Sequence, residues 1–308
     1  MQDEAHERGM SRREFLGLGA AGAGAVLLGG CGAASGGAGK TLKVGNIGWD
    51  EDVAVANLTK ILLQEHLGYG EVTLKTLEAG ALFQGVAGGD LDTFQDVWLP
   101  KTHASYWKKF GDEVTRLPSW YEGAGTLGLA VPDYVEAKSI ADLNEYKSRF
   151  GGRITGIESG AGEMSIVQNK VIPAYGLNYK LVASSTPAML AALKKAISAK
   201  KPIVVTLWKP HWAFTAFPIR YLEDPKDAFG KPDHIYTIVR KGLKKDQPEA
   251  YALLDAMKLS PEQLGKLELS IRKHGQNTPT KGVRAWLKDN RRVVDPWIKA
   301  AKKAGKGS

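Results

Sequence analysis

Three of the tryptophans stand where predicted strands end. Trp49 closely follows the predicted strand 42–47, and Trp98 and Trp208 each close a short predicted strand of their own. In open α/β sheets, ligands bind outside the carboxyl ends of the strands, because the loops there face a crevice. We therefore expect the three indole rings to line one binding site.

Three indole faces around one point suit a ligand that carries positive charge but has no N–H group to donate. A quaternary ammonium group is such a ligand, because the negative face of an aromatic ring attracts its diffuse charge. Each contact of this kind contributes roughly 0.5–2 kcal/mol. Three contacts supply about half of the roughly 8 kcal/mol that micromolar binding requires. Burial and a contact to the far end of the ligand must supply the remainder.

Trp98 and Trp208 share a pattern of tryptophan, any residue and proline, and a histidine follows each of them. His211 comes three residues after Trp208, and His103 comes five residues after Trp98. An imidazole can donate a hydrogen bond to a carboxylate at the far end of a ligand. His211 is the best candidate for this contact. His103 is either a second polar contact or a structural residue of the turn.

Two further features lie close to the predicted site. Glu51 comes two residues after Trp49. It either stabilises the N-terminus of the following helix or attracts a cation such as choline. The glycine-rich stretch Gly156–Gly162 leads into another predicted helix, and its amides can bind an anionic group. It lacks the Gly-Lys-Ser/Thr ending of a phosphate-binding loop.

Residues 1–30 have the features of an export signal. A twin-arginine pattern over Ser11–Leu16 precedes an apolar segment that is too short to span a bilayer, for which about 20 residues are needed. Leu28-Gly29-Gly30-Cys31 then resembles a bacterial lipobox, which implies cleavage before Cys31 and lipidation of its thiol. Cys31 is the only cysteine in the chain, so no intrachain disulfide can form. These features predict that the protein is extracytoplasmic and is anchored to the cell membrane as a lipoprotein.

The rest of the chain alternates between strand and helix patterns, which predicts an α/β fold with largely parallel sheets. A flexible tether is expected over 31–39. About 270 further residues exceed what one core usually holds, so two lobes are expected. The first lobe is predicted to comprise 40–133 together with 235–308, and the second 134–234. Strands are predicted over 42–47, 72–77, 94–98, 125–131, 153–157, 179–184, 203–207 and 235–239, and the C-terminal helices over 246–257, 261–273 and 281–304.

The charge pattern argues against a nucleic-acid partner. The chain carries a formal net charge of +9, but its basic residues are scattered. A C-terminal run of lysines is either a solvated helix face or a surface attracted to an anionic envelope. Its members are Lys299, Lys302, Lys303 and Lys306.

The sequence contains no recognisable catalytic motif. We find no Gly-x-Ser-x-Gly elbow, no His-Glu-x-x-His and no His/Cys cluster with metal-ligand spacing. A dinucleotide-binding pattern of letters at Gly17–Gly22 lies inside the export signal and follows no strand. We therefore predict a binding protein without enzymatic activity, metal or cofactor.

Seven stretches together resemble the glycine betaine/choline/carnitine substrate-binding proteins of ABC uptake systems. They run through nearly the whole chain after residue 40, in the order found in that family. The stretches are Gly45–Asn57, Gly80–Gly89, Val97–His103, Gly156–Met164, Thr206–Phe214, Tyr221–Pro225 and Ile235–Leu243.

This resemblance implies a two-lobed, hinge-closing fold of the type II periplasmic kind, with the ligand cleft between the lobes. It implies an aromatic cage at Trp49, Trp98 and Trp208 and a carboxylate-binding histidine at His211. The Pro-His-Trp ending looks more like glycine betaine binders than choline binders, whereas Glu51 keeps choline in consideration. The resemblance also implies an ABC permease and its ATPase as partners of a monomeric binding protein.

Three alternatives remain open from the sequence. The ligand of the same fold can be choline, carnitine or proline betaine instead of glycine betaine. The chain can also be an exported enzyme that uses the cage to bind a choline ester. A third alternative is a sensor or adhesin that presents the ligand.

Overall fold

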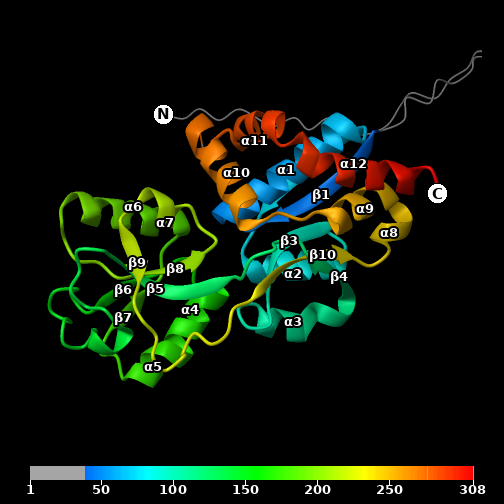
Figure 1. The fold of residues 1–308 in the computed structure, drawn as a ribbon. Coiled ribbons are helices and arrows are strands. Elements are labelled where there is room, and N and C mark those ends of the chain that lie inside the picture. Colours follow the sequence, from blue (N-terminus) through cyan, green and yellow to red (C-terminus); the bar gives the residue numbers. More distant parts are fainter. Residues whose placement is uncertain (1–38, 276, 308) are drawn as a thin grey trace, which may run out of the picture. The chain divides into compact units, whose positions relative to one another are not determined.

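The computed structural model describes residues 39–275 and 277–307, which lie in one compact unit. The predicted export signal, Cys31 and nearly all of the predicted tether lie outside the described residues. The described chain contains two five-stranded sheets with helices packed on them (Figure 1).

The first sheet has the strand order β2-β1-β3-β10-β4. Strand β1 is parallel to both β2 and β3, whereas β10 runs antiparallel to β3 and β4. The sheet therefore combines N-terminal strands with one that returns from much later in the sequence. The strands are β1 (Lys40–Asn46), β2 (Tyr69–Thr76), β3 (Thr93–Leu99), β4 (Val114–Ser119) and β10 (His234–Arg240).

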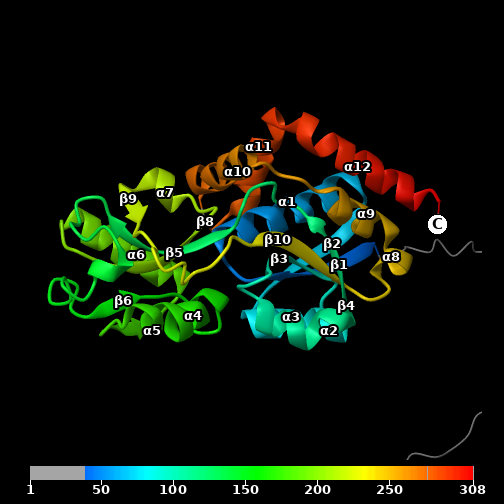
Figure 2. The same cartoon turned by 60° about the horizontal axis from the view of Figure 1, so that its bottom comes forward.

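Helices cover both faces of this sheet (Figure 2). Helix α1 contacts β1, β2 and β3 on one side and α10 and α11 on the other. It is therefore buried on most of its surface, and its apolar side chains do not form a single stripe. The helices of this part are α1 (Asp50–His66), α2 (Ala79–Gly88), α3 (Ala104–Phe110), α8 (Leu243–Asp246), α9 (Pro248–Ala256), α10 (Pro261–His274), α11 (Pro279–Asp289) and α12 (Arg291–Gly305).

The C-terminal helix that the sequence predicts over 281–304 is two helices in the structure. Helix α11 ends before Asn290, whose side-chain amide donates to the carbonyl of Trp286 at 2.8 Å. This bond satisfies a carbonyl at the end of α11, and α12 starts afresh at Arg291. Across 39–275 and 277–307, none of the helices combines the length and the apolar character that crossing a membrane would require.

The second sheet has the strand order β7-β6-β8-β5-β9. Strands β6, β7 and β8 run parallel, and β5 is antiparallel to β8 and β9. Its strands are β5 (Thr126–Pro132), β6 (Arg153–Thr155), β7 (Lys180–Val182), β8 (Val205–Lys209) and β9 (Ile219–Tyr221). The helices of this part are α4 (Gly162–Ile166), α5 (Ile172–Tyr175), α6 (Thr186–Ser198) and α7 (Ala213–Ala216). A π-helical turn covers Val167–Val171, and a short 3₁₀ turn covers Ile140–Asp142.

The prediction of a two-lobed α/β fold with two sheets is confirmed. The predicted first boundary, at 133, differs from the structure, because β5 pairs with β8 and belongs to the second sheet. The chain therefore passes to the second sheet before Thr126. The two crossing segments meet at Gly125 and Asp233, whose backbones exchange two hydrogen bonds of 2.8 Å. The sequence of an isolated apolar strand does not indicate its partner, and this is why the boundary was misplaced.

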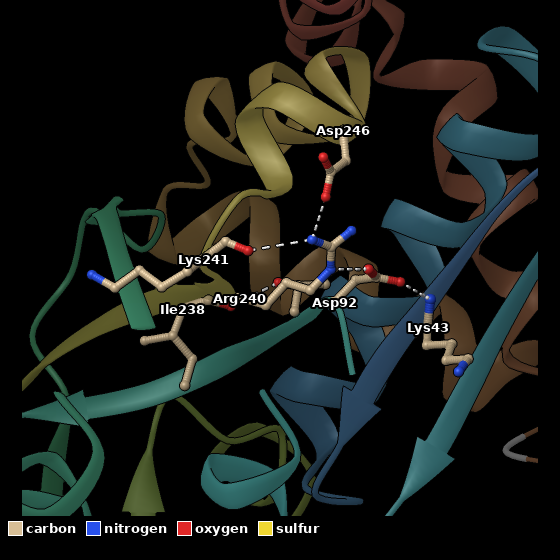
Figure 3. A network of polar contacts seen from close by, with 7 residues as sticks. Lys43, Asp92, Ile238, Arg240, Lys241 and Asp246 are labelled. Atoms are coloured by element: carbon tan, nitrogen blue, oxygen red, sulfur yellow. Dashed lines mark hydrogen bonds and ion pairs between the residues drawn. The ribbon is translucent and has the colours of Figure 1, made fainter. Parts of the chain in front are cut away.

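A polar network ties three segments of the first sheet together (Figure 3). The carboxylate of Asp92, just before β3, accepts a hydrogen bond from the backbone N–H of Lys43 at 2.8 Å. Its other oxygen accepts from Nε of Arg240 at 2.7 Å. The Arg240 guanidinium also donates to Asp246 at 2.7 Å. Asp92 thus holds the end of β10 next to β1, and through Arg240 the network reaches the end of α8.

We expect Asp92→Ala to lower the free energy of unfolding by about 1–3 kcal/mol, because a half-buried guanidinium and a backbone N–H both lose their acceptor. Urea denaturation measures this loss. The matched control is Asp246→Ala, since this carboxylate is half exposed and bonds the same guanidinium. It should cost less than about 1 kcal/mol. Equal losses for both variants would contradict a special role for Asp92.

Candidate functional site

The structure brings the three predicted tryptophans together around one small cavity of about 10 Å³. Trp49 comes from the start of α1, Trp98 comes from β3 of the first sheet, and Trp208 comes from β8 of the second sheet. All three side chains are buried, and the ring centroids of Trp49 and Trp208 are 5.4 Å apart. The other residues that line the cavity are Thr102, Leu127, Ile157 and Glu163.

Strand ends place these rings as the spacing predicts. Trp98 and Trp208 lie in the last residues of β3 and β8, and Trp49 is the N-cap residue of α1. The Leu99–Pro100 and Lys209–Pro210 peptide bonds that follow are both cis. The carboxyl ends of strands from both sheets therefore contribute to the same cavity.

The three indole N–H groups share one kind of partner, a carboxylate. Such a bond fixes the plane of each ring by its edge and leaves its face for the cavity. The pairs are Trp98 with Asp96 at 2.8 Å, Trp208 with Glu51 at 2.9 Å and Trp49 with Glu158 at 3.4 Å.

Glu51 is fully buried and lies against the Nε1 edge of Trp208, so the structure does not place it at the mouth of the cavity. Burial raises the pKa of its carboxyl well above the usual range, and the charges of Asp96 and Glu268 raise it further. Its visible role is to orient the ring of Trp208. A direct contact between Glu51 and a ligand stays a prediction.

His211 presents an N–H donor beside the cage. Its Nδ1 accepts from the backbone N–H of Ala213 at 3.0 Å, so the ring proton belongs on Nε2. Nε2 lies 3.2 Å from a carboxylate oxygen of Asp50, without good hydrogen-bond alignment. The imidazole also meets the ring of Trp208 edge-on, at a centroid distance of 4.9 Å. This donor can therefore turn to an acceptor of similar chemistry on a ligand.

His103 serves the turn after β3. Its Nδ1 accepts from the backbone N–H of Trp98 at 3.1 Å, and its ring stacks on Trp49 at 5.9 Å. Burial lowers the pKa of His103 to about 3, so the ring is neutral. These contacts favour the structural alternative of the two that the sequence left open. Contact with a ligand is untested.

Glu163 was not among the predicted site residues, yet it lines the cage cavity. It lies in the first turn of α4 and is 1% exposed, and neither carboxyl oxygen has a well-aligned hydrogen-bond partner. Burial raises its pKa to about 8, and the nearby backbone N–H groups of Gly128 and Leu207 offset part of that rise. The sequence signal was the Gly-Ala-Gly-Glu stretch at the start of the helix, in which only the backbone amides had been considered.

The loop before Glu163 depends on a glycine. A Cβ atom at Gly162 would lie 1.8 Å from the carbonyl oxygen of Thr102, so no other residue allows this approach. Two residues earlier in the same loop, the carbonyl of Gly160 accepts a hydrogen bond from the hydroxyl of Tyr106 at 2.8 Å. The start of α4 is therefore held directly against the segment that follows β3.

Among residues 39–275 and 277–307, no group of three or more His, Cys, Asp or Glu side chains is arranged to hold a metal ion. Three buried acids near the cage, Glu51, Asp52 and Asp96, bond instead to indole or backbone N–H groups. What this arrangement can do is enclose a small cation without N–H donors and offer one imidazole donor beside it.

Two sheets joined by paired crossing segments, with a cage assembled from both, define a substrate-binding protein. The chain belongs to the family described as the substrate-binding domain of ABC-type glycine betaine transport systems, whose model matches residues 40–289.

Three proteins of known description are similar to this chain. The glycine betaine/carnitine transport binding protein GbuC of Listeria monocytogenes is 42% identical over 179 residues, which cover 57% of each chain, so the match spans somewhat over half of that relative. The structure of lactococcal OpuAC in its closed-liganded conformation with glycine betaine has 37% identity and a TM-score of 0.77, covering 84% of this chain and 99% of that one. An ABC-transporter choline-binding protein in complex with choline has 26% identity and a TM-score of 0.74, covering 86% and 97%.

Proposed function

We propose that this chain captures glycine betaine or a related quaternary-ammonium solute outside the cytoplasm and delivers it to an ABC permease. The observation that carries the proposal is the convergence of three buried indole rings, Trp49, Trp98 and Trp208, on one cavity. The relatives named above, which bind glycine betaine, carnitine or choline by their descriptions, support the same ligand class.

In this proposal the two sheets hold different parts of one ligand. Trp49 and Trp98 of the first lobe receive the trimethylammonium group, and Trp208 and His211 of the second lobe close on it. The Nε2–H of His211 then donates to the ligand carboxylate in place of Asp50, which it now faces at 3.2 Å. Binding biases an open–closed equilibrium about the crossing segments, and no covalent bond is made or broken.

Choline is the second candidate, and a specific observation favours it. Glu163 lines the cavity, and the buried Glu51 and Asp96 lie at the indole edges, so the acidic surroundings suit a ligand with net positive charge. Carnitine and proline betaine share the cation and the carboxylate, and His211 can serve both.

The wider setting is also part of the proposal. Lipidation at Cys31 would anchor the protein to the outer face of the cell membrane, and 31–39 would tether it there. A permease and its ATPase would be the protein partners, and a single copy would suffice for binding. Choline-ester hydrolysis by an exported enzyme is the rival function, and a turnover assay with the pure protein tests it.

Calorimetric titration of the protein with glycine betaine and, separately, with choline tests the proposed function. We expect saturable 1:1 binding of at least one of them, in the micromolar range or tighter. If neither ligand binds, the cage does not serve quaternary ammonium groups and the proposal fails.

A further inference from the structure

The cage has one wall that is not aromatic. Glu163 lines the same cavity as the three tryptophans, at 1% exposure. Its position is fixed, because Gly162 next to it packs against the carbonyl of Thr102. A carboxyl group therefore stands at the cavity where the indole faces converge.

This carboxyl group lacks the partners that buried polar groups usually have. Neither of its oxygens has a well-aligned hydrogen-bond donor within the described residues. Leaving a buried acceptor unpaired is costly, so an exception of this kind calls for an explanation. A cation inside the cage would supply the missing partner, and the low dielectric of a buried site would strengthen the attraction.

We propose that Glu163 is the fourth wall of the cage, which pairs as a carboxylate with the quaternary ammonium group and gives up its proton when the ligand enters. The inference rests on the proposed function. It adds a ligand-binding residue to the predicted set and a reason why the site prefers a permanent cation, which has no proton to exchange with Glu163.

The groups that face Glu163 leave it neutral in the empty protein. Backbone N–H groups of β5 and β8 approach it, and Tyr221 of β9 is the titratable side chain whose own pKa the Glu163 charge helps to raise. Burial, the dominant cause, sets the pKa of Glu163 at about 8. Other titratable groups close to the cage are Glu51, Asp52, Asp96, Glu158, Asp233, His103 and His211.

The sign of the pH dependence follows from this. Below the pKa of about 8 the ligand must displace a proton from Glu163, whereas above it the carboxylate is ready. Affinity should therefore rise with pH, by up to about tenfold per pH unit below 8, and level off above. A cage without an ionisable wall would show no such rise from this source.

The experiment is calorimetric titration of the full chain with glycine betaine and with choline at pH 7, in phosphate and in Tris buffer. The difference in heat between buffers counts protons, and we expect release of about one proton on binding. In Glu163→Gln this release should disappear, and affinity at pH 8.5 should fall by at least about tenfold, since the amide keeps the shape but not the charge.

The matched control is Glu268→Gln. Glu268 is also buried, with its pKa raised to about 8, but it does not line the cage cavity. This variant should keep the proton release. A Glu163→Gln protein that binds as tightly as the wild type and releases the same proton would overturn the inference while leaving the proposed function intact.

Two further results distinguish a failure of this inference from a failure of the proposed function. Wild-type affinity that does not change between pH 6 and 8, without proton release, overturns the role of Glu163 even if its variant fails to fold. Wild-type protein that binds neither ligand refutes the proposed function itself, and this inference with it. Circular dichroism of Glu163→Gln confirms that the variant compared is folded.

Discussion

Trp208→Ala should weaken the binding of glycine betaine and choline alike by about 30- to 1000-fold. The change removes one of three faces that contact the cation, worth up to about 2 kcal/mol in a desolvated site. It also leaves Glu51, whose carboxylate now accepts from Nε1 of Trp208 at 2.9 Å, buried without that donor. An unpaired buried acceptor costs about 1–3 kcal/mol more. Calorimetric titration at constant pH measures the sum.

Two comparison variants distinguish a lost cation contact from general damage. Trp208→Phe keeps an aromatic face but not the N–H donor, so its affinity should lie between those of the wild type and Trp208→Ala. Trp107→Ala removes a half-buried tryptophan that lies outside the cavity, where Arg116 approaches its ring. It should bind both ligands as the wild type does. A loss of less than threefold in Trp208→Ala would show that the cage does not hold the cation.

The positions of the cage tryptophans could be predicted because a simple rule governs them. Residues at the carboxyl ends of strands in α/β sheets face the crevice, and Trp49, Trp98 and Trp208 are all buried there. The rule concerns backbone direction, which local sequence specifies. It does not concern how a helix turns its first residues, and this is why the place of Glu51 behind the ring of Trp208 was not foreseen.

The same distinction explains Glu163. A glutamate in the first turn of a helix usually serves the helix dipole in solvent. Here Gly162 packs closely on Thr102, 60 positions away, and the adjacent Glu163 lines the cavity. No local pattern contains this contact. Tertiary packing therefore places an ordinary helix-start residue in the lining of the cavity.

The fold was predicted best where strands are long and apolar, and worst at the edges. Strand β4, which was not predicted, contains Pro118 and lies at the edge of its sheet, where proline is tolerated. The three-residue strand β9 was too short to recognise. For β5 the strand itself was predicted but its sheet was not, because its partners β8 and β9 come more than 70 residues later. Sheet membership is a long-range property.

His211→Ala should separate the two candidate ligands. Removing this donor should weaken glycine betaine binding by about 10- to 100-fold, since a hydrogen bond to a charged group is worth about 1.5–3 kcal/mol. Choline has no carboxylate to receive the bond, so its affinity should change by less than about threefold. Titration of the variant with both ligands measures the ratio. His234→Ala, which removes an exposed histidine at the start of β10, is the control that should leave both affinities unchanged.

The ratio of the two losses matters more than either alone, because His211 also touches Trp208 edge-on at 4.9 Å. If its role were only to support that ring, both ligands would lose affinity together. In the present arrangement Nε2 faces Asp50, so a ligand carboxylate must take the place of a carboxylate already near it. Asp50→Asn should therefore improve glycine betaine binding relative to choline, because it removes the competing charge while keeping the side-chain shape. A preference that shifts in opposite directions in the two variants would assign His211 to the ligand carboxylate, and parallel losses would assign it to the cage.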